Sequence, residues 1–321
     1  MSLQEQLKKI ILEVLPDVDC VVGWGPGPEP LRGSPYFMRN AKDVDAFTPG
    51  PLAVQNTAVF LPEYAGKKTG VVVKGCDSRS AVQLISEKLI KREEVVIIGF
   101  PCEGVVDAGK IAAKLAQYGE TGEVESAEAD EKEIRVKIAG QKTSIAMAEI
   151  RADKCNRCKY PNAVLYDYFA GEARDASDVK DDFNDLSGLE KMSLGKRFEF
   201  WEKEISRCIR CHACRNSCPL CVCRDHCVAV SREPHWVTQA DSARDKLMFQ
   251  VIHATHMAGR CTDCGECQRA CPVGIPVILL KRAFGRAVGQ IFDYAAGLDV
   301  ESTPPLLAFK VEETAIRERE W

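Results

Sequence analysis

The sequence predicts an α/β domain in the N-terminal half of the chain and a smaller α-helical domain in the C-terminal half. The first half alternates short apolar runs with amphipathic segments, which is typical of strands and helices that follow one another in a layered sheet. The second half contains two apolar segments with helical spacing, and 11 of the 16 cysteines lie there, between Cys208 and Cys271. We therefore expect two units of different architecture, the second of them organised around its cysteines.

In the N-terminal half, residues 4–15 are expected to form an amphipathic helix. The runs at residues 70–73 and 95–98 are continuously apolar, which is typical of parallel strands buried on both faces. The expected strands are residues 18–22, 58–61, 70–73 and 95–98, the expected later helices are residues 80–91 and 105–118, and an added hairpin is expected at residues 133–139 and 142–148. The predicted fold is thus a parallel or mixed sheet with an added hairpin.

The C-terminal half is expected to be helical, because residues 239–256 and 275–296 repeat apolar side chains at helical spacing. An acidic, polar segment separates the two halves and is expected to be a linker. The predicted boundaries are residues 1–172 for the α/β domain, 173–196 for the linker, 197–300 for the helical domain and 301–321 for a C-terminal tail.

The composition is that of an ordinary globular protein, with 45% hydrophobic and 28% charged residues and a formal net charge of −4. No basic block indicates a nucleic-acid-binding surface. No apolar run approaches the roughly 18 residues of a membrane span, and the N-terminus lacks the apolar stretch of a secretory signal. We therefore expect a cytoplasmic protein whose cysteines stay reduced and act as ligands, as catalysts or as buried apolar side chains.

Two cysteine motifs with identical spacing stand out. Residues 208–219 read C-x-x-C-x-x-C-x-x-x-C-P, and residues 261–272 repeat this pattern. It is the run of two-cluster ferredoxins, in which the fourth cysteine of each run ligates the other cluster. Paired C-x-x-C motifs also bind zinc, but a four-ligand zinc site does not account for the repeated third and fourth cysteines and the proline. The repeat therefore predicts two [4Fe–4S] clusters.

Crossed ligation assigns eight cysteines to these clusters. The first cluster takes Cys208, Cys211, Cys214 and Cys271, and the second takes Cys261, Cys264, Cys267 and Cys218. The long segment between the motifs and the expected helices make this half similar to the α-helical dicluster ferredoxin module of respiratory and bifurcating enzymes.

The charges within the two motifs differ. The first motif carries Arg210, His212 and Arg215 between its cysteines, whereas the second carries Asp263, Glu266 and Arg269. Positive neighbours favour the more negative, reduced form of a cluster. The sequence therefore predicts a higher reduction potential for the first cluster than for the second.

Four further cysteines are candidates for a third cluster. Cys76 and Cys102 follow two of the expected buried strands, at the sheet edge where open α/β sheets bind ligands, and the helices that follow favour anionic ligands. Cys155 and Cys158 form a C-x-x-C pair downstream. Together these four thiols predict a third [4Fe–4S] cluster, the alternative being that they are inert buried side chains, which is our interpretation of Cys20.

Cys221, Cys223 and Cys227 directly follow the first motif and are additional candidate ligands. They replace the downstream C-x-x-C pair, join it, or form a fourth site with a non-cysteine ligand such as His226. The sequence leaves these alternatives open.

Several of these segments resemble one family. The loops at residues 73–79 and 97–104, the pair Cys155-x-x-Cys158 and the run C-P-x-C-x-C at residues 218–223 are similar to those of the beta-subunit family of coenzyme F420 hydrogenase and formate dehydrogenase. The iron–sulfur subunits of anaerobic sulfite reductase and sulfhydrogenase also look similar. The resemblance covers roughly residues 70–275. It implies an electron-transfer subunit of an anaerobic multi-subunit redox enzyme, with a further cluster near the four N-terminal cysteines.

Some members of this family also carry FAD and react with F420. The glycine-rich residues 23–28 do not match a flavin-binding segment, because their prolines lack the N–H donors that a phosphate cradle needs. FAD is thus a candidate cofactor by analogy alone.

Together, these observations predict a non-catalytic iron–sulfur electron-transfer subunit of a cytoplasmic oxidoreductase of hydrogenase, formate dehydrogenase or heterodisulfide reductase type. The expected partners are a flavin- or metal-containing catalytic subunit, a ferredoxin or a heterodisulfide reductase-like subunit. The alternative is an FAD-containing subunit that itself oxidises or reduces F420 or NAD(P).

Overall fold

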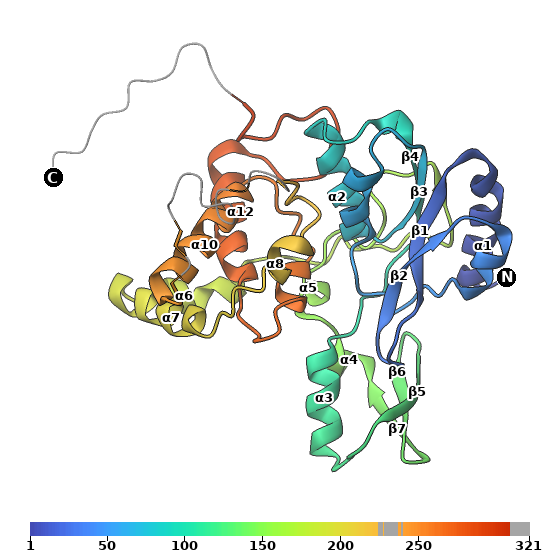
Figure 1. The fold of residues 1–321 in the computed structure, drawn as a ribbon, viewed down its shortest axis with the longest axis horizontal. Coiled ribbons are helices and arrows are strands. Elements are labelled where there is room, and N and C mark those ends of the chain that lie inside the picture. The colour runs from blue at the N-terminus through green and yellow to red at the C-terminus, as the bar shows by residue number, and fades with distance from the viewer. Residues whose placement is uncertain (224–226, 228–236, 239, 309–321) are drawn as a thin grey trace.

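A computed structural model describes residues 1–223, 227, 237–238 and 240–308 of the chain. An α/β half is followed by a helical half, as the sequence predicts (Figure 1). His226, residue 239 at the start of one expected helix, and residues 309–321 of the expected tail lie outside the described residues.

A five-stranded mixed sheet forms the centre of the N-terminal half, with the strand order β2-β1-β3-β4-β8. The strands are β1 (Cys20–Pro26), β2 (Gly33–Met38), β3 (Thr69–Val73), β4 (Val95–Gly99) and β8 (Tyr168–Phe169). β1 pairs antiparallel with β2, and the other three pairs are parallel. The carboxyl ends of β3 and β4 therefore lie together at one edge.

Different helices cover the two faces of this sheet (Figure 1). Val72 packs in one apolar cluster with α1 (Leu3–Val14), whereas Val71 and Val73 pack in another with α2 (Gly75–Ser86). Successive side chains of a strand point to opposite faces. Burial on both faces explains why the apolar run in β3 is continuous.

One expected strand is wrong. Residues 58–61 lie in the 3₁₀ helix η3 (Thr57–Tyr64), which begins where the Asn56 side chain accepts a hydrogen bond from the Ala58 N–H at 3.0 Å. Pro62 within this segment has no N–H to donate to a strand ladder. The apolar run is instead explained by packing against β3 and its neighbours.

The expected hairpin is confirmed and has a third strand. β5 (Val124–Ala129), β6 (Glu133–Ile138) and β7 (Gln141–Ala146) form a separate antiparallel sheet, whose apolar face packs on α3 (Ala108–Gln117). Three of the six residues of β5 are acidic or polar and exposed, so its sequence gives a weak strand signal.

In the described part of the helical half, the long helices are α7 (Leu194–Ser206), α10 (Ala243–His256) and α12 (Ile278–Phe292). Their apolar faces meet in one cluster that also contains several cysteines. No helix in the described part of the chain is long and apolar enough to cross a membrane.

The remaining elements of the described residues are short and come from both halves. They are η1 (Leu15–Asp17), η2 (Ala41–Ala46), η4 (Arg92–Glu94), α4 (Met147–Ile150), α5 (Asp153–Asn156), η5 (Asn184–Leu186), α6 (Ser187–Glu190), α8 (Ala213–Asn216) and α11 (Glu266–Arg269).

The two halves are joined by hydrogen bonds from α2 to the second cysteine motif and its surroundings. Arg79 donates to the backbone oxygens of Ala296 at 2.7 Å and Thr262 at 3.1 Å. Ser80 Oγ lies 2.9 Å from the Thr262 hydroxyl, and Arg260 pairs with Glu87 at 2.5 Å. These contacts hold the second motif against the α/β half.

Gly75 allows a close approach that a side chain would prevent. A Cβ added there would lie 1.7 Å from the Tyr160 backbone oxygen. We expect Gly75→Ala to lower the free energy of unfolding by about 1–3 kcal/mol, the usual cost of overpacking a tightly packed site. Urea unfolding of anaerobically purified protein measures this. Gly188→Ala is the control, because its Cβ would meet no atom within 4 Å; equal stability of the two variants would contradict the prediction.

Candidate metal centres

The two cysteine motifs share one backbone conformation. Arg210 and His212 of the first motif have φ values of 53° and 58°, and the equivalent Asp263 and Gly265 have values of 56° and 72°. Positive φ is uncommon outside glycine and marks a tightly constrained turn. The helices α8 and α11 then follow at equivalent positions and contact each other. Both motifs thus curl their chain in the same way around their first three cysteines.

The fourth cysteine of the first motif lies beside the second motif. Burial raises the pKa of Cys264 and Cys267, and the neighbouring Cys218 raises both further. Cys218 Sγ also lies 3.6 Å from the sulfur of Met257, just before the second motif. This placement is the one that crossed ligation of the second cluster requires.

The fourth cysteine of the second motif lies in the apolar cluster that contains Cys208 and Cys214. The Ile275 N–H donates to its sulfur, Cys271 Sγ, at 3.3 Å. Burial raises the pKa of Cys214 to about 11. Cys211, in contrast, is exposed, so the first motif reaches the protein surface.

The four N-terminal candidate cysteines line one cavity of about 670 Å³ between the sheet edge and the helical half. They are Cys76, Cys102, Cys155 and Cys158. Cys261 of the second motif lines the same cavity. Three segments that are distant in the sequence therefore bring four thiols to one place, next to the second motif.

Backbone amides are directed at two of these thiols. The Gly104 N–H donates to Cys102 Sγ and the Val105 N–H to Cys155 Sγ, both at 3.4 Å. Burial raises the pKa of Cys102 to about 11, so its thiolate needs a nearby positive charge. Cluster iron supplies such charge when it is bound. Four thiols with amide donors at two of their sulfurs fit a [4Fe–4S] cluster.

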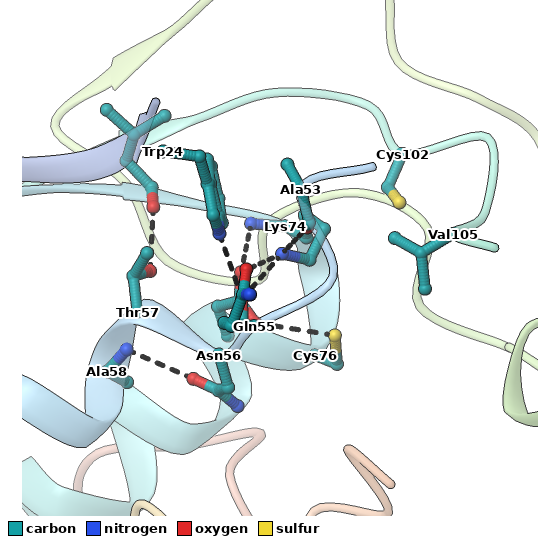
Figure 2. Close-up of polar contacts among 12 residues, drawn as sticks. Trp24, Ala53, Gln55, Asn56, Thr57, Ala58, Lys74, Cys76, Cys102 and Val105 are labelled. Carbon is teal, nitrogen blue, oxygen red and sulfur yellow. Dashed lines mark hydrogen bonds and ion pairs between the residues drawn. The ribbon is translucent and has the colours of Figure 1, made fainter. Parts of the chain in front are cut away.

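A buried lysine anchors the loop that carries Cys76. Lys74 Nζ donates to the backbone oxygens of Ala53 at 2.8 Å and Gln55 at 3.0 Å (Figure 2). It also pairs with the buried Asp77 carboxylate at 3.0 Å. This network fixes the end of β3, and thereby the position of the Cys76 thiol at the cavity.

The cavity is rich in positive side chains. They come from both halves of the chain: Lys74, Arg79, Arg151, Lys154, Arg157, Lys159, Arg174, Lys281, Arg282 and Arg286. None of them is predicted as a site residue from the sequence, because they are dispersed along the chain and form no basic block. Five acidic side chains line the same cavity, those of Glu103, Asp175, Asp181, Asp182 and Asp263. The basic side chains outnumber them, so the lining has a net positive charge and favours anionic ligands.

Arg282 links the segment between the two halves to the second motif. Its guanidinium is 2% exposed, donates to Asp181 at 2.7 Å and Asp185 at 3.0 Å, and also contacts Asp263. Burial raises the pKa of Asp181, but the hydrogen bonds from Arg282 outweigh this effect and hold the pKa below its usual value. Arg157 of the α/β half reaches the same Asp263 at 3.3 Å.

The additional cysteines lie elsewhere. Cys221, Cys223 and Cys227 line a small second pocket together with His253 and His256. They do not line the cavity that holds the downstream C-x-x-C pair. Within the described residues, no three cysteine, histidine or acidic side chains are placed to hold a single metal ion.

Comparison with known proteins gives two family matches. The first is the family model for the beta subunit of coenzyme F420 hydrogenase/dehydrogenase, which covers the C terminus of that subunit and matches residues 66–186. The second is the model described as "4Fe-4S dicluster domain", which matches residues 204–275.

Two relatives are similar over most of the chain. The F420-dependent formate dehydrogenase subunit beta of Methanocaldococcus jannaschii is 25% identical, with 92% of this chain and 90% of the relative covered. The F420-dependent formate dehydrogenase 1 subunit beta of Methanococcus maripaludis is also 25% identical, with 90% and 89% covered. A chain of the F420-reducing [NiFe] hydrogenase complex from Methanosarcina barkeri matches with a TM-score of 0.41 and 12% identity, covering 64% of this chain and 89% of that one.

The paired motifs and the dicluster match define this chain as an iron–sulfur protein with a helical dicluster domain. Residues 66–186 match the model of the beta-subunit family of coenzyme F420 hydrogenase and dehydrogenase. Both the resemblance and the class of iron–sulfur electron-transfer subunit that the sequence predicts are thereby confirmed.

We expect Arg282→Met to lower the free energy of unfolding by about 2–3 kcal/mol, because Asp181 loses its cation and Asp185 and Asp263 keep only the more distant Arg157. Urea unfolding under anaerobic conditions measures the change. Arg286→Met is the matched control on the same helix, since its ion pair with Glu190 is much more exposed and should contribute less than about 1 kcal/mol. Equal effects of the two substitutions would contradict this prediction.

Proposed function

We propose that this chain is the electron-relay subunit of a multi-subunit oxidoreductase and carries three [4Fe–4S] clusters. Two clusters belong to the dicluster domain with crossed ligation, and the third binds Cys76, Cys102, Cys155 and Cys158. The relatives are beta subunits of F420-dependent formate dehydrogenases, so an F420-linked complex is the favoured setting. The other subunits then supply the catalytic centre, which contains a flavin or a metal, and the further acceptor, a ferredoxin or a heterodisulfide reductase-like subunit.

The observation that carries this proposal is the shared cavity. Four thiols of the α/β half line it together with Cys261, a predicted ligand of the second cluster. Electrons pass efficiently only between centres that are close together, and a common wall makes the third and second sites neighbours. The exposed Cys211 at the first site then provides a contact point with a partner at the other end of the relay.

Iron and acid-labile sulfide measured on anaerobically purified protein test the cluster count. Three cubanes give about 12 iron atoms per chain, whereas the dicluster domain alone gives about 8. We expect Cys102→Ser with Cys155→Ser to reduce the content to about 8. A content of about 8 in the unaltered chain would overturn the third cluster, and zinc in place of iron would overturn the whole proposal.

Crossed ligation predicts which cluster each substitution disturbs. Cys271→Ala removes a ligand of the first cluster although it belongs to the second motif, and Cys218→Ala does the reverse. We expect electron paramagnetic resonance (EPR) of the reduced protein to show Cys271→Ala changing only the first cluster's signal. Cys20→Ala is the control, because that buried cysteine lies in the sheet core and should leave all signals unchanged. A changed second-cluster signal in Cys271→Ala would show that ligation is not crossed.

A second candidate function is suggested by the size and charge of the cavity. Its volume of about 670 Å³ lies within the range of small-molecule and cofactor sites, and basic side chains outnumber acidic ones in its lining. An FAD bound beside the third cluster would let this chain itself oxidise or reduce F420 or NAD(P). A yellow chromophore that remains after cluster removal, with about one flavin per chain, would favour this function, and its absence would favour the pure relay.

A further inference from the structure

Two lysines lie among the cysteines that the proposed clusters use. Lys281 of α12 is 2% exposed, and its Nζ lies 3.4 Å from His253 Nε2. Lys154 of α5 donates from Nζ to the Cys264 backbone oxygen at 2.5 Å. Both side chains line the 670 Å³ cavity. In contrast to Lys74, which pairs with Asp77, neither lysine contacts a carboxylate oxygen at ion-pair distance in the described part of the chain.

Lys281 faces the thiols of both dicluster sites. The thiols that act on its amine electrostatically are those of Cys267, Cys218, Cys261 and Cys214. Ile278 and Leu280, which flank it on α12, pack in the apolar cluster that contains Cys214 and Cys267. Three of these cysteines belong to the predicted second cluster, and Cys214 belongs to the first. The amine thus lies between these two sites, and a lysine amine carries a positive charge at neutral pH.

Lys154 occupies the equivalent place between the second and third sites. It precedes Cys155 in the sequence, and its side chain extends across to the second motif, where a Cβ at Gly265 would come within 2.9 Å of Lys154 Cδ. The groups that act on its amine electrostatically are Cys76, Glu266, Cys155 and Cys264. Cys76 and Cys155 are third-site thiols, whereas Cys264 is a second-site thiol.

We propose that Lys154 and Lys281 are shared electrostatic bridges, each of which raises the reduction potentials of two neighbouring clusters at once. Lys281 acts on the first and second clusters, and Lys154 acts on the second and third. Reduction adds one electron, and therefore one negative charge, to a cluster that is already anionic with its thiolates. A fixed positive charge in a low-dielectric interior stabilises the reduced form. The second cluster faces both lysines and gains from each.

The role of Lys154 rests on the proposed function, because it requires the third cluster. The role of Lys281 requires only the two dicluster sites. A potentiometric titration followed by EPR reports each cluster separately and is made on the complete chain, purified anaerobically with its co-purifying subunits.

We expect Lys154→Met to lower the potentials of the second and third clusters and to leave the first unchanged. Lys281→Met should lower those of the first and second and leave the third unchanged. The expected shift is at least a tenfold lower ratio of reduced to oxidised cluster at a fixed potential, which is about 59 mV for a one-electron couple. The control is Lys114→Met, because Lys114 pairs with Glu149 and does not line the cavity, and it should shift no potential by this amount.

An unchanged second-cluster potential in both variants would overturn the proposal, as would shifts confined to one cluster in each. An iron content of about 8 in the unaltered chain would instead overturn the third cluster and, with it, the Lys154 bridge. The titration of Lys281→Met would then still test the bridge between the first and second clusters. If a methionine variant loses clusters, the arginine variants Lys154→Arg and Lys281→Arg are measured instead. They keep the positive charge, so the potentials of the two clusters next to each lysine should stay near the native values. A tenfold change in the ratio of reduced to oxidised cluster in an arginine variant would count against an electrostatic role.

Discussion

The structure depends on the contact between the second cysteine motif and the carboxyl edge of the sheet. Arg79 and Lys154 reach from the α/β half to backbone oxygens of Thr262 and Cys264, so the motif is held by donors that its own half does not supply. Buried thiol ligands are costly to ionise, and positive side chains with iron offset that cost. The same contact that joins the halves thus also closes the cavity and places Cys76, Cys102, Cys155 and Cys158 beside the second cysteine motif.

The architecture could be predicted from the sequence where one signal dominates. The buried runs in β3 and β4 and the repeated cysteine spacing each allow little else, and the mixed sheet, the hairpin and the dicluster domain follow from them. The prediction of a strand at residues 58–61 was wrong, because an apolar run buried in a 3₁₀ helix has the same composition as a buried strand. β2 and β8 gave no clear signal, since one is only partly buried and the other has two residues.

The candidate site could be predicted only in its ligands. Closely spaced cysteines indicate metal ligands in a sequence. Arg282 and Lys281 lie in an ordinary amphipathic helix, and only the structure shows that both side chains are buried. The structure also changes the expected effect of the motif charges on the two cluster potentials. Asp263 is neutralised by Arg282, and Glu266 by Arg269 at 2.7 Å, so the acidic residues of the second motif do not act as free negative charges. The predicted difference in potential between the first two clusters therefore cannot rest on those residues.

The walls of the cavity come from opposite ends of the chain, and this has a consequence for biogenesis. Cys76, Cys102, Cys155 and Cys158 leave the ribosome early, but the wall formed by residues 259–263 and 281–296 is synthesised more than a hundred residues later. Until that wall arrives, the four thiols face solvent on one side. Iron for the proposed third cluster would therefore reach these thiols most easily before that wall docks, and the docked wall would enclose the cluster.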